Sequence, residues 1–239
     1  MAPNIRTLLN KIIAGKRHFD SPVVNTQCSE FEVNNWTLSD FILEQIVPAV
    51  GIRPYPLNEQ LLMAGSICRF KPDHIFEWGT HLGVSARIFY ETSKTFGLGT
   101  VIHTIDLPDE AQHIEHPGSE HARFIKHIPE INIYRGDGLE TAVRVATGLP
   151  PHSRLLFFLD GDHGYESVLR ELSEITSLFP AACIMLHDTF YQEPGSGYNT
   201  GPCLAIRKVF EKGAGKYQVI ETKTGLPGMT VLYPVTETD

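Results

Sequence analysis

From residue 74 onward, the chain alternates short runs rich in Ile, Val and Phe with longer segments of helical periodicity. This alternation is typical of βα units whose strands lie side by side in a parallel sheet. The short runs predict five strands, over residues 74–79, 100–107, 131–137, 154–162 and 182–188. The longer segments predict helices over residues 83–96, 139–148, 165–179 and 203–213. The predicted fold class is therefore α/β, with a doubly wound sheet.

The C-terminal part of the chain departs from this alternation. Residues 217–223 and 229–235 are two strand-like runs, and the sequence TGLPG between them is typical of a hairpin turn. We expect these runs to close the sheet as an antiparallel pair. The complete prediction is a Rossmann-like, mostly parallel seven-stranded sheet closed by an antiparallel hairpin.

The N-terminal part has helical rather than strand periodicity. Residues 38–50 and 58–70 both show this periodicity, and the Pro-rich sequence GIRPYP separates them. We therefore predict an N-terminal helical cap region over residues 1–70 and a main domain over residues 71–239.

The charge balance favours a small-molecule ligand. The net charge of the 239 residues is -8 and the pI is about 5.7. A nucleic-acid groove needs clustered Lys and Arg to displace counterions from phosphates, so no nucleic-acid partner is expected.

The sequence also predicts a cytoplasmic location. None of the four cysteines has CxxC or Cys/His spacing. No stretch approaches the ~20 apolar residues of a membrane helix, and the N-terminus lacks a signal-peptide pattern. Residues 1–19 form a basic amphipathic pattern, which we expect to dock on the protein itself or on a second subunit rather than on a membrane. A homo-oligomer is therefore an open alternative.

Polar residues follow each of the five predicted strands. In an open parallel sheet, ligands bind outside the carboxyl ends of the strands, where adjacent crossovers diverge. The alternative for any one acid is that it caps the following helix. Five successive strand ends with an acid favour a binding site, formed by Glu77, Asp106, Asp137, Asp160 with Asp162 and His163, and His187 with Asp188.

The sequence FEWGTHLGVSA, residues 76–86, predicts a glycine turn after the first strand. It lacks the middle glycine of the dinucleotide fingerprint GxGxxG and the Gly-Lys-Ser/Thr of a phosphate-binding loop. Glu77 would also repel a phosphate at this turn. A ligand with a cationic centre and no phosphate suits the turn better.

Two further acids indicate the rest of that ligand. Asp106 lies 23 residues beyond Gly83, near the spacing at which an acid accepts hydrogen bonds from ribose hydroxyls. Asp137 comes next along the sheet edge, where it could accept a bond from an adenine amino group. An adenosine with a cationic, amino-acid-like extension describes S-adenosylmethionine.

Residues 74–235 resemble the class I S-adenosylmethionine-dependent methyltransferases. FEWGTHLGVSA is similar to the first motif of that family, TIDL to its ribose-binding acid and RGDG to its adenine-side loop. The resemblance implies donor-binding roles for Glu77, Gly79, Thr80, Gly83, Ser85, Asp106, Asp137 and Asp160.

A longer segment, FLDGDHGYESVLRELSEITSLFPAACIMLHDTF, resembles a narrower branch with cephalosporin-hydroxylase-like proteins and metal-dependent sugar and phenol O-methyltransferases. This resemblance implies that Asp160, His187 and Asp188 bind a divalent metal, Mg²⁺ or similar. Such an ion would lower the pKa of an acceptor hydroxyl and fix it for attack on the methyl group. His187 departs from the branch, where an acid is commoner, and imidazole favours softer metals than Mg²⁺.

The histidines offer two candidates for the general base. His163 follows Asp160 by three residues, where similar enzymes carry a basic residue that takes the proton of the acceptor. Alternatively, His187 is the base and no metal binds, or His163 caps the following helix. The histidines between residues 103 and 127 lack metal-site spacing, and most are expected at the surface.

Methyl transfer requires alignment and exclusion of water. Residues 191–202 are loop-like by composition and are expected to border the acceptor. The N-terminal segment with Trp36 and Tyr55 would cover the other side, unless Trp36 packs in the core, which we favour.

The sequence therefore predicts a methyltransferase that moves a methyl group from S-adenosylmethionine to a hydroxyl of a small molecule, such as a sugar or a natural-product intermediate. A nicotinamide-dependent oxidoreductase, a metal-dependent hydrolase and a binding module without turnover are the alternatives. The missing GxGxxG argues against the oxidoreductase.

Overall fold

The computed structural model of the protein describes residues 18–25, 31–108, 110–111, 117–192, 195, 199–211 and 217–234. Through these residues runs one seven-stranded sheet of order β3-β2-β1-β4-β5-β7-β6. Its strands are β1 (His74–Trp78), β2 (Val101–Asp106), β3 (Ile131–Arg135), β4 (Leu155–Leu159), β5 (Cys183–His187), β6 (Tyr217–Thr222) and β7 (Met229–Pro234).

The strand directions confirm the predicted sheet. Strands β1 to β5 are parallel to one another. Strand β7 runs antiparallel to both of its neighbours, β5 and β6. The central strands are buried along nearly their whole length, which explains why they are continuous apolar runs without alternation.

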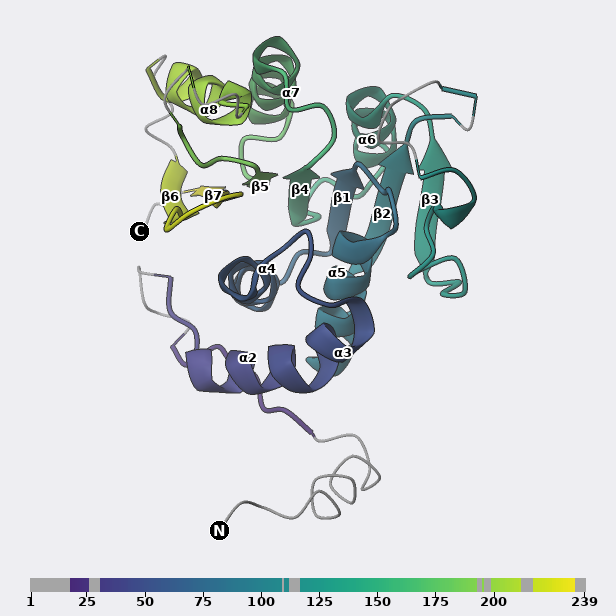
Figure 1. Cartoon of the computed structure of the whole chain (residues 1–239), viewed down its shortest axis with the longest axis vertical. Coiled ribbons are helices and arrows are strands. Elements are labelled where there is room, and N and C mark those ends of the chain that lie inside the picture. Colours follow the sequence, from purple (N-terminus) through teal and green to yellow (C-terminus); the bar gives the residue numbers. More distant parts are fainter. Residues whose placement is uncertain are drawn as a thin grey trace.

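Helices cover both faces of this sheet (Figure 1). On one face lie α6 (Gly138–Ala146), α7 (Tyr165–Leu178) and α8 (Gly201–Glu211). On the other face lie α4 (Leu57–Phe70) and α5 (Val84–Thr95), with α2 (Asn35–Phe41) and α3 (Val47–Val50) outside them. A single 3-10 turn, Gly118–Glu120, lies in the crossover from β2 to β3. None of the helices in the described ranges is long and apolar enough to cross a membrane.

The two helical segments predicted near the N-terminus are confirmed. Asn34 caps α2 by accepting hydrogen bonds from the backbone of Trp36 and Thr37. Between α2 and α3 the helix widens to a π-helix at Ile42–Ile46, just before Pro48, which has no amide hydrogen to continue a regular helical ladder.

These N-terminal helices share one apolar core with the sheet. Phe41, Ile46 and Met63 are fully buried in the same cluster as Ile75 of β1 and Phe158 of β4. The division at residues 70 and 71 stays a prediction, and residues 1–17, the larger part of the predicted amphipathic segment, lie outside the described residues.

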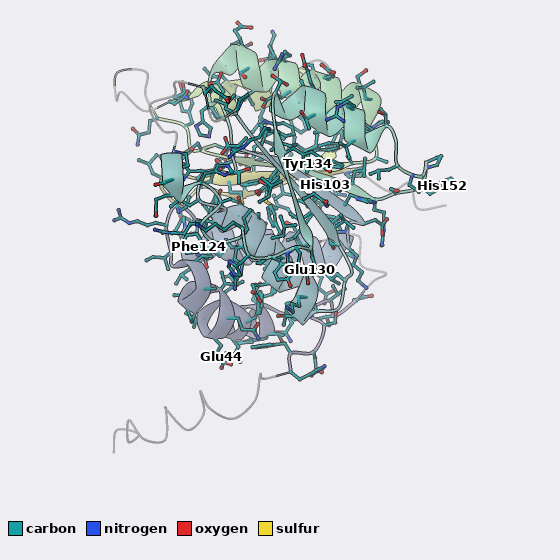
Figure 2. The ribbon with its side chains drawn as sticks, turned by 90° about the vertical axis from the view of Figure 1, so that its right-hand side faces the viewer. Glu44, His103, Phe124, Glu130, Tyr134 and His152 are labelled. Atoms are coloured by element: carbon teal, nitrogen blue, oxygen red, sulfur yellow. The ribbon has the colours of Figure 1, made fainter. Side chains whose placement is uncertain are left out.

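One aromatic side chain, Trp36, lies elsewhere than expected. The prediction that Trp36 packs in the core is wrong, because Trp36 is 84% exposed. Helix α2 instead buries Leu38 and Phe41, which point to the opposite side. His103 is also buried, unlike the surface position expected for most histidines between residues 103 and 127. Its Nδ1 atom lies 3.1 Å from the Tyr134 hydroxyl, and Figure 2 shows these two side chains together on neighbouring strands.

Candidate active site

The glycine turn after β1 brings two parts of the backbone unusually close. Gly79 has a φ of 96°, and a Cβ at this position would lie 2.1 Å from the carbonyl oxygen of Asp160. Gly83, with a φ of 80°, precedes α5, and a Cβ there would lie 2.7 Å from the Ile125 side chain. Glycine is needed at both positions, because each combines a positive φ with a neighbouring atom too close for a Cβ.

Glu77 lies beneath this turn. One of its oxygens accepts a hydrogen bond from the Thr104 hydroxyl at 2.6 Å. The Thr104 oxygen is in turn 2.6 Å from the Thr80 hydroxyl, which must act as donor because Thr104 has given its only proton to Glu77. Burial raises the pKa of Glu77 to about 7, although hydrogen bonds from Thr104 and Ser85 oppose the shift.

Asp106, at the end of β2, organises the other side of the turn. Its carboxylate accepts a hydrogen bond from the backbone N–H of His81 at 2.9 Å, and the Nε2 atom of His121 lies 3.0 Å from the same oxygen. Asp106 therefore connects the glycine turn to the crossover between β2 and β3.

Asp137, at the end of the next strand, acts as the cap of α6. It accepts a hydrogen bond from the backbone of Glu140 at 2.8 Å, and Arg170 of α7 lies 3.3 Å from its other oxygen. The capping alternative is thus realised at this position, and the side chain still faces the ligand cavity described next.

A cavity of about 1430 Å³ opens at the carboxyl ends of the strands. Most of the site residues predicted from the sequence line it: Gly79, Thr80, Ser85, Asp106, Asp137, Asp160, His163, His187 and Asp188. Glu77 and Gly83 are not part of the lining. They support the turn from below and from the start of α5.

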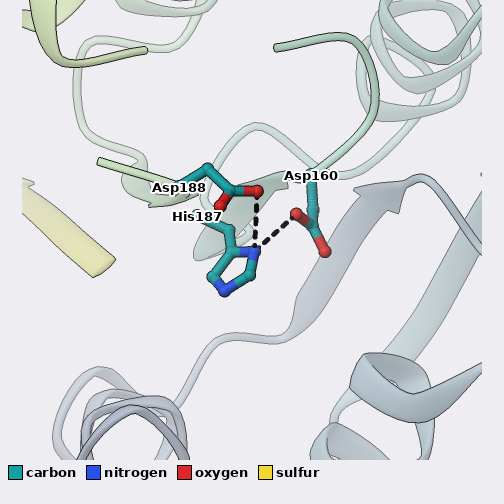
Figure 3. A group of neighbouring side chains, drawn as sticks. All are labelled: Asp160, His187 and Asp188. Atoms are coloured by element: carbon teal, nitrogen blue, oxygen red, sulfur yellow. Dashed lines mark hydrogen bonds and ion pairs between the residues drawn. The ribbon is translucent and has the colours of Figure 1, made fainter. Parts of the chain in front are cut away.

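At one end of this cavity, Asp160, His187 and Asp188 form a compact cluster (Figure 3). The Nδ1 atom of His187 is 2.9 Å from Asp160 and 3.4 Å from Asp188. Asp188 has a φ of 54°. This left-handed backbone conformation turns its side chain toward that of His187, although adjacent residues of a strand point to opposite faces.

His163 completes the cluster from the start of α7. Its Nε2 atom lies 3.3 Å from Asp160 and 3.3 Å from Asp188. The alternative that His163 caps α7 is not realised, because the cap residue is Gly164, and the side chain that bonds there is Asp162, which accepts from the Gly164 N–H at 2.9 Å. The His163 backbone carbonyl accepts a hydrogen bond from Asn199 at 2.6 Å, which ties the cluster to the segment before α8.

Electrostatics in the cluster favour charged side chains. Burial opposes a charge on His187, but the carboxylates of Asp160, Asp188 and Glu59 outweigh it and raise its pKa well above the ordinary value. Burial also opposes ionisation of Asp160, but His187 and His163 hold the pKa of its carboxyl below the usual range. His187 is therefore ion-paired with the carboxylates around it.

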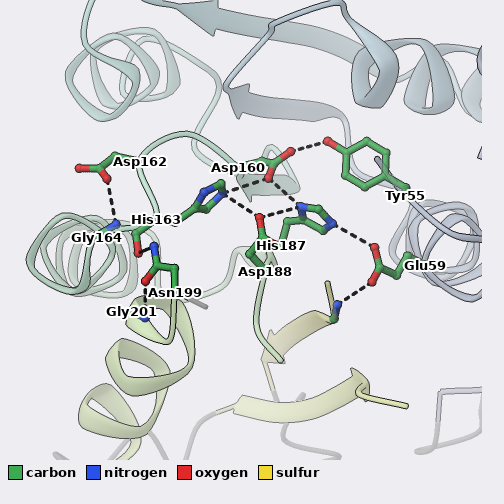
Figure 4. Close-up of polar contacts among 11 residues, drawn as sticks. Tyr55, Glu59, Asp160, Asp162, His163, Gly164, His187, Asp188, Asn199 and Gly201 are labelled. Carbon is green, nitrogen blue, oxygen red and sulfur yellow. Dashed lines mark hydrogen bonds and ion pairs between the residues drawn. The ribbon is translucent and has the colours of Figure 1, made fainter. Parts of the chain in front are cut away.

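Two residues from the N-terminal segment reach this cluster (Figure 4). The buried Tyr55 hydroxyl donates a hydrogen bond to Asp160, and the Tyr55 ring lies edge-on to His187 with centroids 4.8 Å apart. Tyr55 therefore lies against the cluster, and the expectation that this is the acceptor side stays a prediction. Glu59 accepts a hydrogen bond from His187 Nε2 at 3.0 Å. Sequence reasoning missed Glu59, because an acid in the first turn of a helix is common and carries no signal of its own.

Of the predicted loop at residues 191–202, only part is described. Residues 193, 194 and 196–198 lie outside the described residues. Asn199 both donates to His163 and accepts from the backbone of Gly201 at 2.8 Å. The end of this loop is thus fixed beside the cluster (Figure 4).

Comparisons with known proteins agree with this geometry. Residues 76–189 match the sequence model of a family described as a methyltransferase domain. The fold is similar to the methyltransferase PaMTH1 of Podospora anserina bound to SAH, with a TM-score of 0.53 and 13% identity over 98% of each chain. It is also similar to the O-methyltransferase of Bacillus cereus in complex with SAH, with a TM-score of 0.53 and 12% identity over 96% of each chain.

A third similar structure is the O-methyltransferase TomG of Streptomyces achromogenes, involved in tomaymycin synthesis and solved in complex with SAM. Its TM-score is 0.50, with 15% identity over 98% of this chain and 97% of that chain. No curated protein matches the sequence.

These matches confirm the predicted resemblance. The matched segment begins within β1 and ends just after β5, so it contains the glycine turn and all the strand ends that line the cavity. Residues 76–189 are similar to a methyltransferase domain, and the chain has the fold seen in the O-methyltransferase of Bacillus cereus.

Proposed function

We propose that the protein transfers a methyl group from S-adenosylmethionine to a hydroxyl of a small molecule. The observation that carries this proposal is the single cavity that joins the glycine turn and Asp106 to the cluster of His163, His187 and the two acids. The similar structures from Podospora anserina and Bacillus cereus hold SAH and that from Streptomyces achromogenes holds SAM, which supports the same donor here.

The donor would lie along the turn. Asp106 would accept hydrogen bonds from the ribose hydroxyls, and Asp137 would lie near the adenine. The negative charge of Asp160 beside the turn, and that of Glu77 beneath it once ionised, would favour the cationic sulfonium end over a phosphate. This placement directs the methyl group toward the acidic cluster.

The protein would then accelerate the transfer mainly by positioning the donor and the acceptor. Transfer needs the acceptor oxygen, methyl carbon and sulfur in line, in a site without bulk water. His163 is our choice for the base, since it lines the cavity with a quarter of its side chain exposed. Both ring nitrogens of His187 face carboxylates, so that ring has no free nitrogen with which to accept a proton.

The cluster fits a divalent cation. Ligands about 2.1 Å from one ion and at right angles lie about 3 Å apart, and His187 Nδ1 lies at 2.9 and 3.4 Å from the two acids. His187 also donates its other ring nitrogen to a carboxylate, as metal-binding histidines usually do. Asp160, His187 and Asp188 would hold the ion, which would lower the pKa of the acceptor hydroxyl when bound.

Donor binding tests the proposal and separates it from its rivals. Calorimetric titration should show binding of S-adenosylmethionine and SAH but not of NAD, because the turn lacks the GxGxxG backbone that approaches a pyrophosphate. Incubation with methyl-labelled donor and a panel of phenols and sugars should then label a hydroxyl. Binding of NAD alone would support the oxidoreductase, and hydrolysis that persists in Asp106→Ala would support the hydrolase.

A further inference from the structure

Glu59 and His187 form a buried pair, in which Glu59 has no role of its own in the methyl-transfer scheme above. Glu59 is 1% exposed and lies in the first turn of α4, whereas His187 ends β5. One Glu59 oxygen accepts a hydrogen bond from the backbone N–H of Gly228 at 2.8 Å, and the other faces His187 Nε2 at 3.0 Å. Both oxygens of this carboxylate are therefore committed (Figure 4).

This geometry requires a proton on the Nε2 atom of His187. An ionised carboxylate only accepts hydrogen bonds, so His187 Nε2 must be protonated to bond with Glu59. A half-turn of the ring would place carbon against Glu59 and lose that bond. Glu59 thereby keeps His187 Nδ1 directed at Asp160 and Asp188, at 2.9 and 3.4 Å.

We propose that Glu59 is a positioning residue, which holds the His187 ring by its Nε2–H so that Nδ1 is presented to Asp160 and Asp188. This inference rests on the proposed function for its purpose, because the cluster is the proposed acceptor site, but the role of Glu59 can be measured without any substrate. It adds to the site a residue of the N-terminal helical segment.

The variant Glu59→Gln keeps the shape of the side chain but replaces the acceptor that faces His187 Nε2 with a donor. The Gln carbonyl must accept the Gly228 N–H, because the amide NH₂ would place two donors against each other. The NH₂ group then faces His187 and requires an unprotonated Nε2. His187 then carries its proton on Nδ1 alone, so Nδ1 could take a metal ion only if the hydrogen bond to residue 59 were lost.

Ring nitrogens in ¹⁵N-histidine-labelled full-length protein give the first readout. Two-bond ¹H–¹⁵N correlation spectra, with His187 assigned from the His187→Gln spectrum, should show a protonated Nε2 in the wild type and a bare Nε2 in Glu59→Gln. The control Glu171→Gln makes the same change at another buried glutamate, 5% exposed on α7, and should leave the His187 ring unchanged. A bare Nε2 in the wild type, or an unchanged ring in Glu59→Gln, would overturn the proposal. If Glu59→Gln does not fold, the wild-type spectrum decides the proposal by showing whether His187 Nε2 is protonated.

Titration with Zn²⁺ gives the second readout. Loss of a residue that orients a metal ligand typically weakens metal binding 10–100-fold, so we expect Zn²⁺ affinity to fall by about that factor in Glu59→Gln and not in Glu171→Gln. Equal affinity in wild type and Glu59→Gln would contradict the positioning role. A wild type that binds neither Zn²⁺ nor SAH would instead contradict the proposed function, while the ring spectra would still decide the role of Glu59.

Discussion

A Cβ on Gly79 would lie 2.1 Å from the carbonyl oxygen of Asp160, so the end of β4 rests directly on the turn after β1. The two sides of the cavity, the glycine turn and the acidic cluster, thus meet at this backbone contact, beside the paired strands β1 and β4. A side chain at residue 79 cannot be accommodated without moving one of them.

We expect Gly79→Ala to lower the free energy of unfolding by about 3 kcal/mol or more, because it adds this clash to an unfavourable positive φ. The matched control is Gly97→Ala, where φ is 62° but no heavy atom lies within 4 Å of the added Cβ. That change should cost only about 1–2 kcal/mol. Urea unfolding of the two variants measures the difference, and equal losses would show that the close approach is unimportant.

Asp106→Ala should weaken binding of the donor by about 1–3 kcal/mol, the scale for hydrogen bonds to a charged group. Asp106→Asn keeps one acceptor oxygen, so its affinity for the donor should lie between those of Asp106→Ala and the wild type. Asp73→Asn is the control, since Asp73 pairs with Arg154 at 2.7 Å just before β1, at the opposite edge of the sheet. Calorimetric titration with SAH measures all three, and full affinity in Asp106→Ala would exclude a ribose contact.

Glu77 should make stability depend on pH. Burial raises the pKa of its carboxyl from 4.5 to about 7 in the folded protein. Between these values the unfolded chain releases a proton that the folded chain keeps, so stability falls as pH rises from about 4.5 to 7.

In Glu77→Gln this loss, about 3 kcal/mol for the full shift, should disappear. Urea unfolding of wild type and Glu77→Gln at pH 5 and pH 8 provides the comparison, with the exposed Glu166→Gln as control. An equal change in the free energy of unfolding between pH 5 and pH 8 for wild type and Glu77→Gln would show that the pKa of Glu77 is not raised by folding.

His163→Gln should lower kcat by about 10²–10⁴-fold, the usual contribution of a general base. SAH affinity should stay unchanged, because His163 lies at the acceptor end. The exposed His152→Gln, whose position Figure 2 shows, should leave kcat unaltered. Single-turnover rates with labelled donor distinguish these outcomes, and a wild-type rate in His163→Gln would assign proton removal to another group.

Removal of metal should lower the rate if Asp160, His187 and Asp188 hold an ion. After dialysis against a chelator, we expect Mn²⁺ or Zn²⁺ to restore methyl transfer better than Mg²⁺, because one of the three ligands is an imidazole. A full rate after chelation, with no metal detected by elemental analysis, would rule out an essential ion.

The sequence predicted the sheet and most of the cavity lining for one physical reason. Parallel strands align their carboxyl ends at one edge, so acids that follow successive strands must meet there. Asp160 and Asp188 are 28 residues apart, yet alternation placed them at the same edge of the sheet, and the family resemblance grouped them with His187.

Glu59 could not be predicted in this way. Its contact with His187 spans 128 residues and depends on how α4 packs against the sheet, which no local pattern encodes. The prediction for Trp36 failed for a related reason, since hydrophobicity alone does not say which side of α2 faces the core. Leu38 and Phe41 take that side.

The hydrogen bond from Gly228 to Glu59 also determines when the site can be completed during synthesis. It joins residues 169 positions apart in the chain, so a nascent chain that ends before the closing hairpin lacks the amide that fixes Glu59. The glycine turn and the acids of β4 and β5 leave the ribosome earlier. The arrangement around His187 is therefore among the last parts of the protein to form, and truncation of the final hairpin should damage the acceptor side while the donor side survives.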